Sequence, residues 1–90
     1  IYAVRDAKSE MFTNPTYKAT PGVAEREFRM MVNDKESQLS AFPEDYALYE
    51  LGEYDNLTGS IVSYDTPKHL VNALQCVQKD TQVPQSLKEA

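Results

Sequence analysis

The 90-residue chain has one cysteine, Cys76, one histidine, His69, and no tryptophan. Cys76 has no partner for an intrachain disulfide, and a cysteine-based zinc site needs about four ligands from cysteine and histidine. A catalytic triad would have to use His69, and no nucleophile motif lies near it. Phosphate-binding glycine loops and metalloprotease motifs are also absent from the sequence. We therefore expect no enzymatic activity, no metal site and no cofactor.

Basic residues are scarce as well. The chain has 9 Lys and Arg against 14 Asp and Glu, which gives a net charge of −5 and a pI near 4.7. Domains that hold nucleic acid electrostatically often have a pI above about 9, so indiscriminate DNA binding is not expected. Residues 36–65 contain seven acidic residues and no basic one, whereas residues 1–35 contain six basic and five acidic ones. The sequence predicts a surface polarised by charge.

Long apolar runs are missing, since none approaches the roughly 20 residues of a membrane span. No membrane partner is expected, and a single cysteine fits a reducing cytosolic compartment. We expect one domain over residues 1–78 and a polar tail over residues 79–90. So small a domain buries only about 60% of the surface its unfolded chain exposes, which favours an oligomeric partner.

Two strands are predicted near the N-terminus. The first covers residues 1–6, where an apolar run ends in two charges. The second, at residues 11–13, is expected to be an edge strand or an ordered loop, because Asn14-Pro15 follows and proline cannot donate to a ladder.

Two helices are predicted from the same N-terminal signal, a threonine cap followed by proline at the first helical position. Thr20-Pro21 precedes the first, and Thr66-Pro67 precedes the second. The expected apolar stripes are Ala24, Phe28, Met31 and Val32 in the first helix and Leu70, Ala73, Leu74 and Val77 in the second. Asn33-Asp34 is expected to end the first helix, and His69 would be a neutral surface or capping histidine in the second.

The middle of the chain predicts a polar connection and then a hairpin. Leu39 and Phe42 are the expected core anchors within residues 33–45. Residues 46–54 and 60–64 have strand character and are separated by a turn-forming cluster. Gly52 inside the first of these strands indicates a bulge or a close backbone approach.

These elements follow the order strand, possible strand, helix, strand, strand, helix. Such an order predicts an α+β fold, in which a three- or four-stranded, mostly antiparallel sheet carries two helices on one face. Cys76 is expected to pack in the core as a small hydrophobe.

The open face of that sheet is the first candidate site. Alternation places Tyr46, Leu48, Glu50 and Tyr54 on one face and Ala47, Tyr49, Leu51 and Glu53 on the other. We expect the helices to cover the second set and to leave Tyr46, Leu48 and Tyr54 open. Exposed aromatic residues stack on nucleic-acid bases, and they are also enriched in dimer interfaces. A homodimer interface is the favoured interpretation.

Basic residues of the N-terminal third form the second candidate site. They are Arg5, Lys8, Lys18, Arg26 and Arg29. If the first strand and the first helix lie side by side, these residues could track a phosphate backbone, whereas Glu25 and Glu27 could neutralise them in a salt-bridged surface. The acidic segment, residues 36–65, lacks the alternating ligand spacing of a calcium loop and is interpreted as a solvated edge.

Three stretches of the sequence together resemble one family. They are Val4-Arg5-Asp6-Ala7-Lys8, then Ala24-x-Arg26-x-Phe28 leading to Val32-Asn33-Asp34, then Pro43-Glu44-Asp45-Tyr46-Ala47-Leu48-Tyr49-Glu50-Leu51-Gly52-Glu53-Tyr54 closing on Thr58-Gly59. This combination looks like the small nonstructural protein of gokushoviruses, single-stranded-DNA bacteriophages of the Microviridae. The likeness runs from about residue 1 to residue 78.

The resemblance implies a non-enzymatic protein of the host bacterial cytoplasm that acts in viral single-stranded-DNA replication, and it carries over no catalytic residue. Single-stranded DNA would then lie along the basic residues of the N-terminal third, with Phe12 and Tyr17 as stacking partners. The alternative is a homodimeric interaction module, which binds a basic phage replication or assembly protein through residues 36–65.

Overall fold

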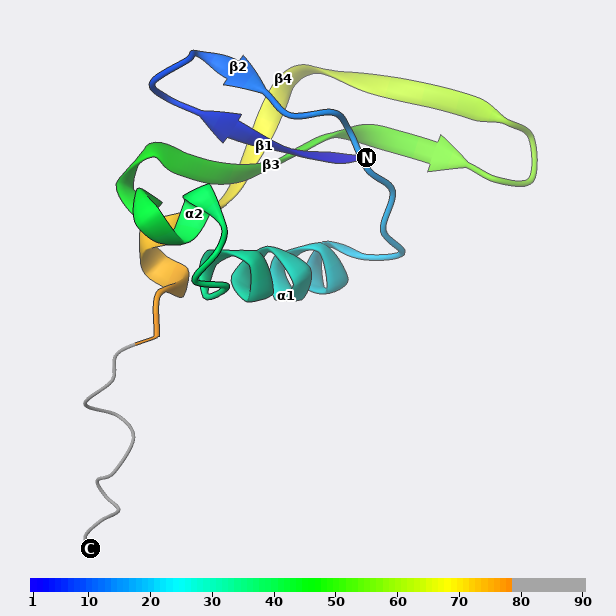
Figure 1. Cartoon of the computed structure of the whole chain (residues 1–90). Coiled ribbons are helices and arrows are strands. Elements are labelled where there is room, and N and C mark those ends of the chain that lie inside the picture. The colour runs from blue at the N-terminus through cyan, green and yellow to red at the C-terminus, as the bar shows by residue number, and fades with distance from the viewer. Residues whose placement is uncertain (79–90) are drawn as a thin grey trace, which may run out of the picture.

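The computed structural model describes residues 1–78, and Figure 1 shows how the elements are arranged. The tail expected at residues 79–90 lies outside the described residues. The strands are β1 (Tyr2–Asp6), β2 (Met11–Phe12), β3 (Tyr46–Asp55) and β4 (Ser60–Asn72). The helices are α1 (Pro21–Val32) and α2 (Gln38–Ala41), and two 3-10 turns are η1 (Pro43–Asp45) and η2 (Ala73–Cys76).

The four strands form one antiparallel sheet in the order β2-β1-β3-β4. The helices lie on one side of this sheet, and within residues 1–78 the other side carries none (Figure 1). The α+β class is therefore confirmed, and so is the edge position of the short strand at Met11–Phe12. No helix in this part of the chain is long and apolar enough to cross a membrane.

The first helix forms where its cap predicts it. The Thr20 side chain accepts a hydrogen bond of 3.2 Å from the Val23 amide, and Pro21 occupies the first helical position, where no N–H is needed. Asn33 caps the other end through its N–H. Ala24, Phe28 and Val32 are buried against the sheet as expected, whereas Met31 is 43% exposed.

The second predicted helix is wrong. Thr66-Pro67 lies inside β4, which continues to Asn72, and only the four residues of η2 follow as a helical turn. Residues 68–72 form a ladder with residues 47–50 of β3. This pairing partner is distant in the sequence, so the local sequence of residues 66–72 does not predict the strand. Proline is tolerated there because β4 is an edge strand, and the backbone N–H groups on its outer side have no partner strand to bond to.

The second helix of the fold is instead α2, inside the connection between α1 and β3. Ser37 caps it by accepting a hydrogen bond of 3.1 Å from the Ser40 amide. Leu39 packs against the core from this turn, as predicted. Phe42 is wrong as an anchor, since it is 53% exposed. The helix α2 has only four residues, so Leu39 is its one apolar side chain that packs against the core.

The predicted hairpin is confirmed, with a longer second strand. Gly59 has φ of +79° at the end of its turn, a conformation that glycine adopts without steric cost. A Cβ on Gly52 would lie 2.1 Å from the Val62 carbonyl oxygen, and the β3–β4 register shifts between Glu50 and Gly52. The close approach and the irregularity predicted for Gly52 are both present.

The core lies between α1 and the two central strands. It consists of Tyr2, Val4, Ala24, Phe28, Val32, Leu48, Ala73 and Cys76. Cys76 is 1% exposed, and burial raises the pKa of its thiol, so it packs as the predicted small hydrophobe.

Candidate nucleic-acid interface

The open face of the sheet carries a row of aromatic side chains. Val4 and Leu48 point into the core, so their strand neighbours Arg5 and Tyr49 face away from α1. Arg5 pairs with Phe12 on β2, and Tyr49 pairs with His69 on β4. We use the name aromatic row for these three ring side chains and the adjacent arginine. Each strand contributes one residue to it: Arg5, Phe12, Tyr49 and His69.

The rings of the aromatic row are in contact. The Phe12 and Tyr49 centroids lie 5.5 Å apart with an interplanar angle of 82°, and those of Tyr49 and His69 lie 5.4 Å apart at 80°. Both pairs have the edge-to-face geometry that aromatic quadrupoles prefer. The Arg5 guanidinium carbon lies 6.0 Å from the Phe12 centroid, at the outer range of a cation–π contact.

Two members of the row are well exposed. Phe12 is 38% exposed, and His69 is exposed at the β4 edge. His69 Nε2 lies 2.7 Å from Asn72 Oδ1, a contact that requires a proton on Nε2 because an amide oxygen only accepts. His69 is thus a surface histidine, as expected, although it lies on a strand. The row offers a cation and aromatic rings on one accessible face.

The set predicted for the open face is corrected here. Leu48 is 3% exposed and belongs to the core, and Tyr46 packs partly against that core. Only Tyr54 is well exposed, at 47%. Alternation separates two faces but does not say which one a helix covers, and the pairing of Val4 with Leu48 decides it. Tyr46, Leu48 and Tyr54 therefore do not form one surface.

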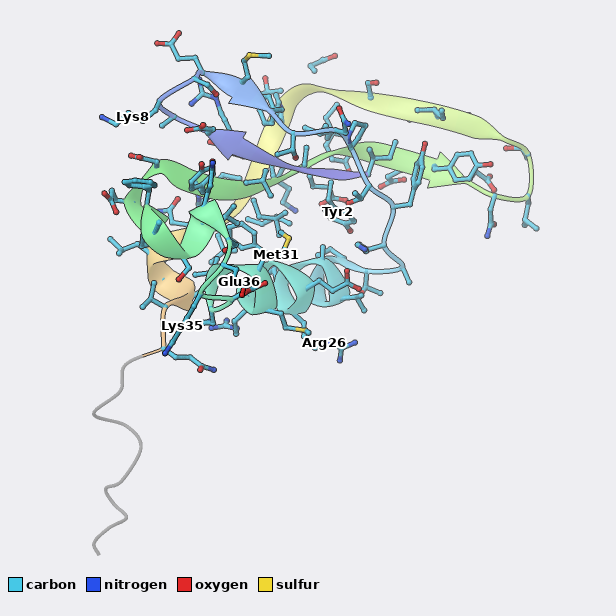
Figure 2. The ribbon with its side chains drawn as sticks, in the orientation of Figure 1. Tyr2, Lys8, Arg26, Met31, Lys35 and Glu36 are labelled. Atoms are coloured by element: carbon cyan, nitrogen blue, oxygen red, sulfur yellow. The ribbon has the colours of Figure 1, made fainter. Side chains whose placement is uncertain are left out.

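The predicted basic patch is divided between two sides of the molecule. Arg5 and Lys8 belong to β1 and the turn after it, whereas Arg26 and Arg29 are exposed on α1. Figure 2 shows Lys8 beyond the end of β1 and Arg26 on the side of α1 away from the sheet. One DNA strand could not follow all of these cations along a single face.

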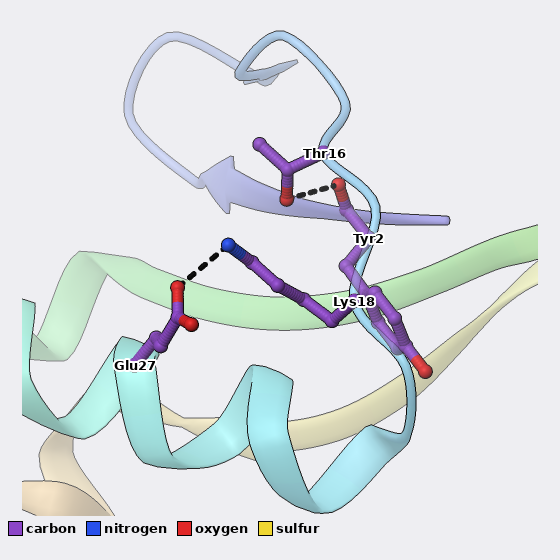
Figure 3. A network of polar contacts seen from close by, with 4 residues as sticks. All are labelled: Tyr2, Thr16, Lys18 and Glu27. Atoms are coloured by element: carbon purple, nitrogen blue, oxygen red, sulfur yellow. Dashed lines mark hydrogen bonds and ion pairs between the residues drawn. The ribbon is translucent and has the colours of Figure 1, made fainter.

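Lys18 is held between the two sides by an ion pair. Its Nζ lies 2.6 Å from Glu27 Oε1 on α1 (Figure 3). The segment before Lys18 is fixed to β1, because Thr16 and Tyr2 exchange two backbone hydrogen bonds of 2.8 Å. Among residues 1–78 this is the one ion pair, so Glu25 and Glu27 do not neutralise Arg26 and Arg29.

An apolar cleft of about 420 Å³ opens beside this ion pair, between α1 and β1. Tyr2, Val4, Phe28, Met31 and Leu39 are among the residues that line it. Figure 2 shows Tyr2 and Met31 in the space between the helix and the sheet. The cleft explains the partial exposure of Met31, because α1 does not close completely over this edge of the sheet.

The sequence suggests different sites for Tyr17 and Tyr54, but the structure brings the two side chains together. Their ring centroids lie 5.4 Å apart, where the segment before α1 passes the outer part of β3. Tyr17 is 60% exposed. The pair is separate from the aromatic row, so Tyr17 does not extend the stacking surface of Phe12.

A buried carboxylate lies on the helix-covered side. Glu50 is 9% exposed, and the Tyr64 hydroxyl lies 3.0 Å from Glu50 Oε2 and 3.2 Å from Glu53 Oε2. Burial, together with these hydrogen bonds and negative charges, raises the pKa of Tyr64 to about 12. Within residues 1–78 no group of three His, Cys, Asp or Glu residues could hold a metal ion.

Sequence reasoning missed Tyr49 and His69 as members of one surface. The sequence predicts Tyr49 on the face covered by the helices and His69 on a helix, and the structure has neither. The signals that identify them are the pairing of β1 with β3, which fixes the face of residues 46–50, and the pairing of Tyr49 with His69 on β4. Arg5 and Phe12 are both among the residues that the sequence suggests for DNA contact, and the structure pairs them across β1 and β2.

Comparison with known proteins gives one family. No curated protein and no solved structure matches the chain significantly. The model of the family described as Phage ORF5 protein matches residues 1–76, which include every strand and helix described above. The chain is therefore a member of the Phage ORF5 protein family, a family of bacteriophage proteins.

Proposed function

We propose that this chain is a non-enzymatic nonstructural protein of a gokushovirus, which binds single-stranded DNA during viral genome replication in the host bacterial cytoplasm. Its DNA would lie on the open face of the sheet, across the aromatic row. The gokushovirus assignment is supported by the three sequence stretches that resemble that group and agrees with membership of a phage family.

The aromatic row is the observation that carries this proposal. Single-stranded nucleic acid is bound by aromatic side chains that stack on bases and by cations that contact the backbone. Phe12, Tyr49 and His69 supply rings, and Arg5 supplies the adjacent cation. Four strands hold these side chains in fixed register, so the site needs no large rearrangement to accept an extended strand.

Charge makes single-stranded DNA a better ligand than duplex DNA for this surface. A duplex presents closely spaced phosphates and hides its base faces, so binding it needs many cations. The chain carries a net charge of −5 and brings few cations to the open face. Stacking of bases on aromatic side chains does not require a basic protein, and the bases of single-stranded DNA are exposed for such stacking.

The test is a comparison of two arginines. Affinity for an oligothymidylate is measured against salt for the wild-type chain, for Arg5→Ala and for Arg26→Ala, which is a matched arginine on the outer side of α1. We expect the slope of log affinity against log salt to fall by about 0.7 per lost phosphate contact in Arg5→Ala, and to stay unchanged in Arg26→Ala. No binding at low salt, or equal effects of the two substitutions, would contradict the proposal.

A second candidate function is a protein-interaction module that uses the acidic segment, residues 36–65. The specific observation is that the only ion pair among residues 1–78 joins Lys18 and Glu27, both outside this segment. Apart from the buried Glu50, the acidic side chains of this segment are not in an ion pair within residues 1–78 and could contact a basic phage replication or assembly protein. Binding of a basic peptide to the wild-type chain, with no binding of oligothymidylate, would favour this function.

A further inference from the structure

The β3–β4 hairpin extends past the rest of the sheet as a two-stranded arm. The ladder between β1 and β3 ends at the pair Tyr2 and Glu50, whereas β3 and β4 stay paired to Asp55 and Ser60. In Figure 1 the arm projects beyond β1 and α1. An isolated two-stranded ribbon is marginally stable in water, so a ribbon of this kind gains from a third strand.

The outer edge of this arm is apolar and uncharged. Ile61 is 58% exposed and Val62 is 56% exposed. Residues 56–64 contain no charged side chain, although Asp55 and Asp65 flank them. Exposed edge strands are normally protected from strand addition by charges, prolines or bulges. Ser60–Ser63 has no charge and no proline, and its pairing with β3 is regular; the register shift of the ladder begins only after Ser63. On β4, the first proline is Pro67, which removes an N–H and limits pairing on that side.

We propose that the β4 edge pairs antiparallel with the β4 edge of a second copy of this chain, around a two-fold axis at Val62. Such an axis stands perpendicular to the sheet and keeps every side chain on its own face. Val62 then lies opposite the second copy's Val62, and Ile61 lies opposite the second copy's Ser63. The two chains form one continuous eight-stranded sheet.

Self-pairing is favoured over pairing with a foreign strand because the segment is self-complementary. In this register Asp65 faces the second copy's Gly59, so no two like charges oppose each other. The segment has no charge with which to select an acidic or a basic partner. A two-fold contact also uses both β4 edges and leaves neither free, so the assembly closes at two chains.

The pairing is tested with the full 90-residue chain by sedimentation at tens of micromolar. We expect a dimer for the wild type and a monomer with unchanged circular dichroism for Val62→Lys, because two lysines would face each other at the axis. Leu57→Lys is the matched control, since Leu57 is 91% exposed at the tip of the arm and outside both strands. That variant should remain a dimer.

Charge rescue sharpens the test. Val62→Glu should also be a monomer, and an equimolar mixture of Val62→Lys and Val62→Glu should form a mixed dimer. A monomeric wild type, or a Val62→Lys variant that dimerises as the wild type does, would overturn the proposal. If either variant does not fold, hydrogen exchange of the wild type decides, because those backbone amides of residues 61–64 that point away from β3 should exchange more slowly as the protein concentration rises. Concentration-independent exchange would contradict pairing at this edge.

Discussion

The two faces of the central strands are formed by alternate residues of the same strands, yet they differ in chemistry. The face under α1 holds Tyr2, Val4 and Leu48, which are less than 8% exposed. The open face holds Arg5 and Tyr49 at the adjoining positions and adds Phe12 and His69 from the flanking strands. One face is a core, and the other is an accessible aromatic surface.

The functional hypothesis therefore depends on which residues of β3 face α1 and which face solvent. A shift of one residue exchanges the two faces of a strand completely. With Leu48 on the open side, the sheet presents a mixed patch suited to a dimer. With Tyr49 on the open side, it presents contacting rings beside an arginine, which suits single-stranded DNA.

The largest expected effect concerns the covered face. Phe28 is 1% exposed and packs against this face, so Phe28→Ala should lower the free energy of unfolding by about 3–5 kcal/mol. Met30, on the same helix, is 68% exposed, and Met30→Ala should change it by less than about 0.5 kcal/mol. Urea denaturation measures both. Similar losses in the two variants would mean that α1 does not cover the sheet as described.

The next effect concerns the point where β3 changes its regular alternation. Tyr64 contacts both Glu50 and Glu53, three positions apart, and the register shift before Gly52 accounts for this. Gly52→Ala would place a Cβ 2.1 Å from the Val62 backbone, and we expect a loss of about 1–3 kcal/mol in thermal or urea unfolding.

Gly22→Ala is the control for that substitution. Gly22 lies in the first turn of α1, where the nearest atom to an added Cβ is Thr20 Oγ1 at 3.8 Å. Alanine should fit there and stabilise the helix by up to about 1 kcal/mol. An equal response of the two glycines would contradict the close approach at Gly52.

The open face should respond in binding more than in stability. Tyr49→Ala removes the central ring of the aromatic row, and base stacking is worth about 1–3 kcal/mol, so oligothymidylate affinity should fall about 5- to 150-fold. Tyr49→Phe keeps the ring and should retain most of the affinity. Fluorescence anisotropy with a labelled oligonucleotide measures both. Equal losses would assign the effect to the hydroxyl group and not to stacking.

The smallest effect is a pH dependence on the covered side. The pKa of Tyr64 is raised to about 12 in the folded chain, against 10.0 in an unfolded one. The folded state therefore holds this proton more tightly, so the resulting stabilisation is complete below pH 10 and is lost as the pH rises from 10 toward about 12. Tyr64→Phe should show a shallower loss of melting temperature across this window. Identical slopes would contradict the hydrogen bonds to Glu50 and Glu53.

The sequence predicted correctly those elements whose formation depends only on residues close together in the chain. Thr20-Pro21 caps α1, and Asn33 ends it, because a cap needs only its own turn. Thr66-Pro67 contains the same dipeptide and forms a strand, because β3 supplies a pairing partner that is distant in sequence. Tertiary pairing overrode the local preference there.

The candidate site was predicted only in part for the same reason. Arg5 and Phe12 are joined by a short hairpin, so their proximity follows from the local sequence. Tyr49 and His69 reach the same face through the pairing of β1 with β3 and of β3 with β4. The paired residues of β1 and β3 are 40 or more positions apart in the sequence. Alternation alone could not choose between the two faces of β3.

The most direct test is to map the DNA-binding face by NMR. The full chain is titrated with an oligothymidylate at low salt, and backbone and side-chain shifts are followed. We expect the largest changes at Arg5, Phe12, Tyr49 and His69, with Arg26 and Arg29 unaffected. Changes confined to α1, or no changes at saturating oligonucleotide, would contradict the assignment of the open face as the DNA-binding surface.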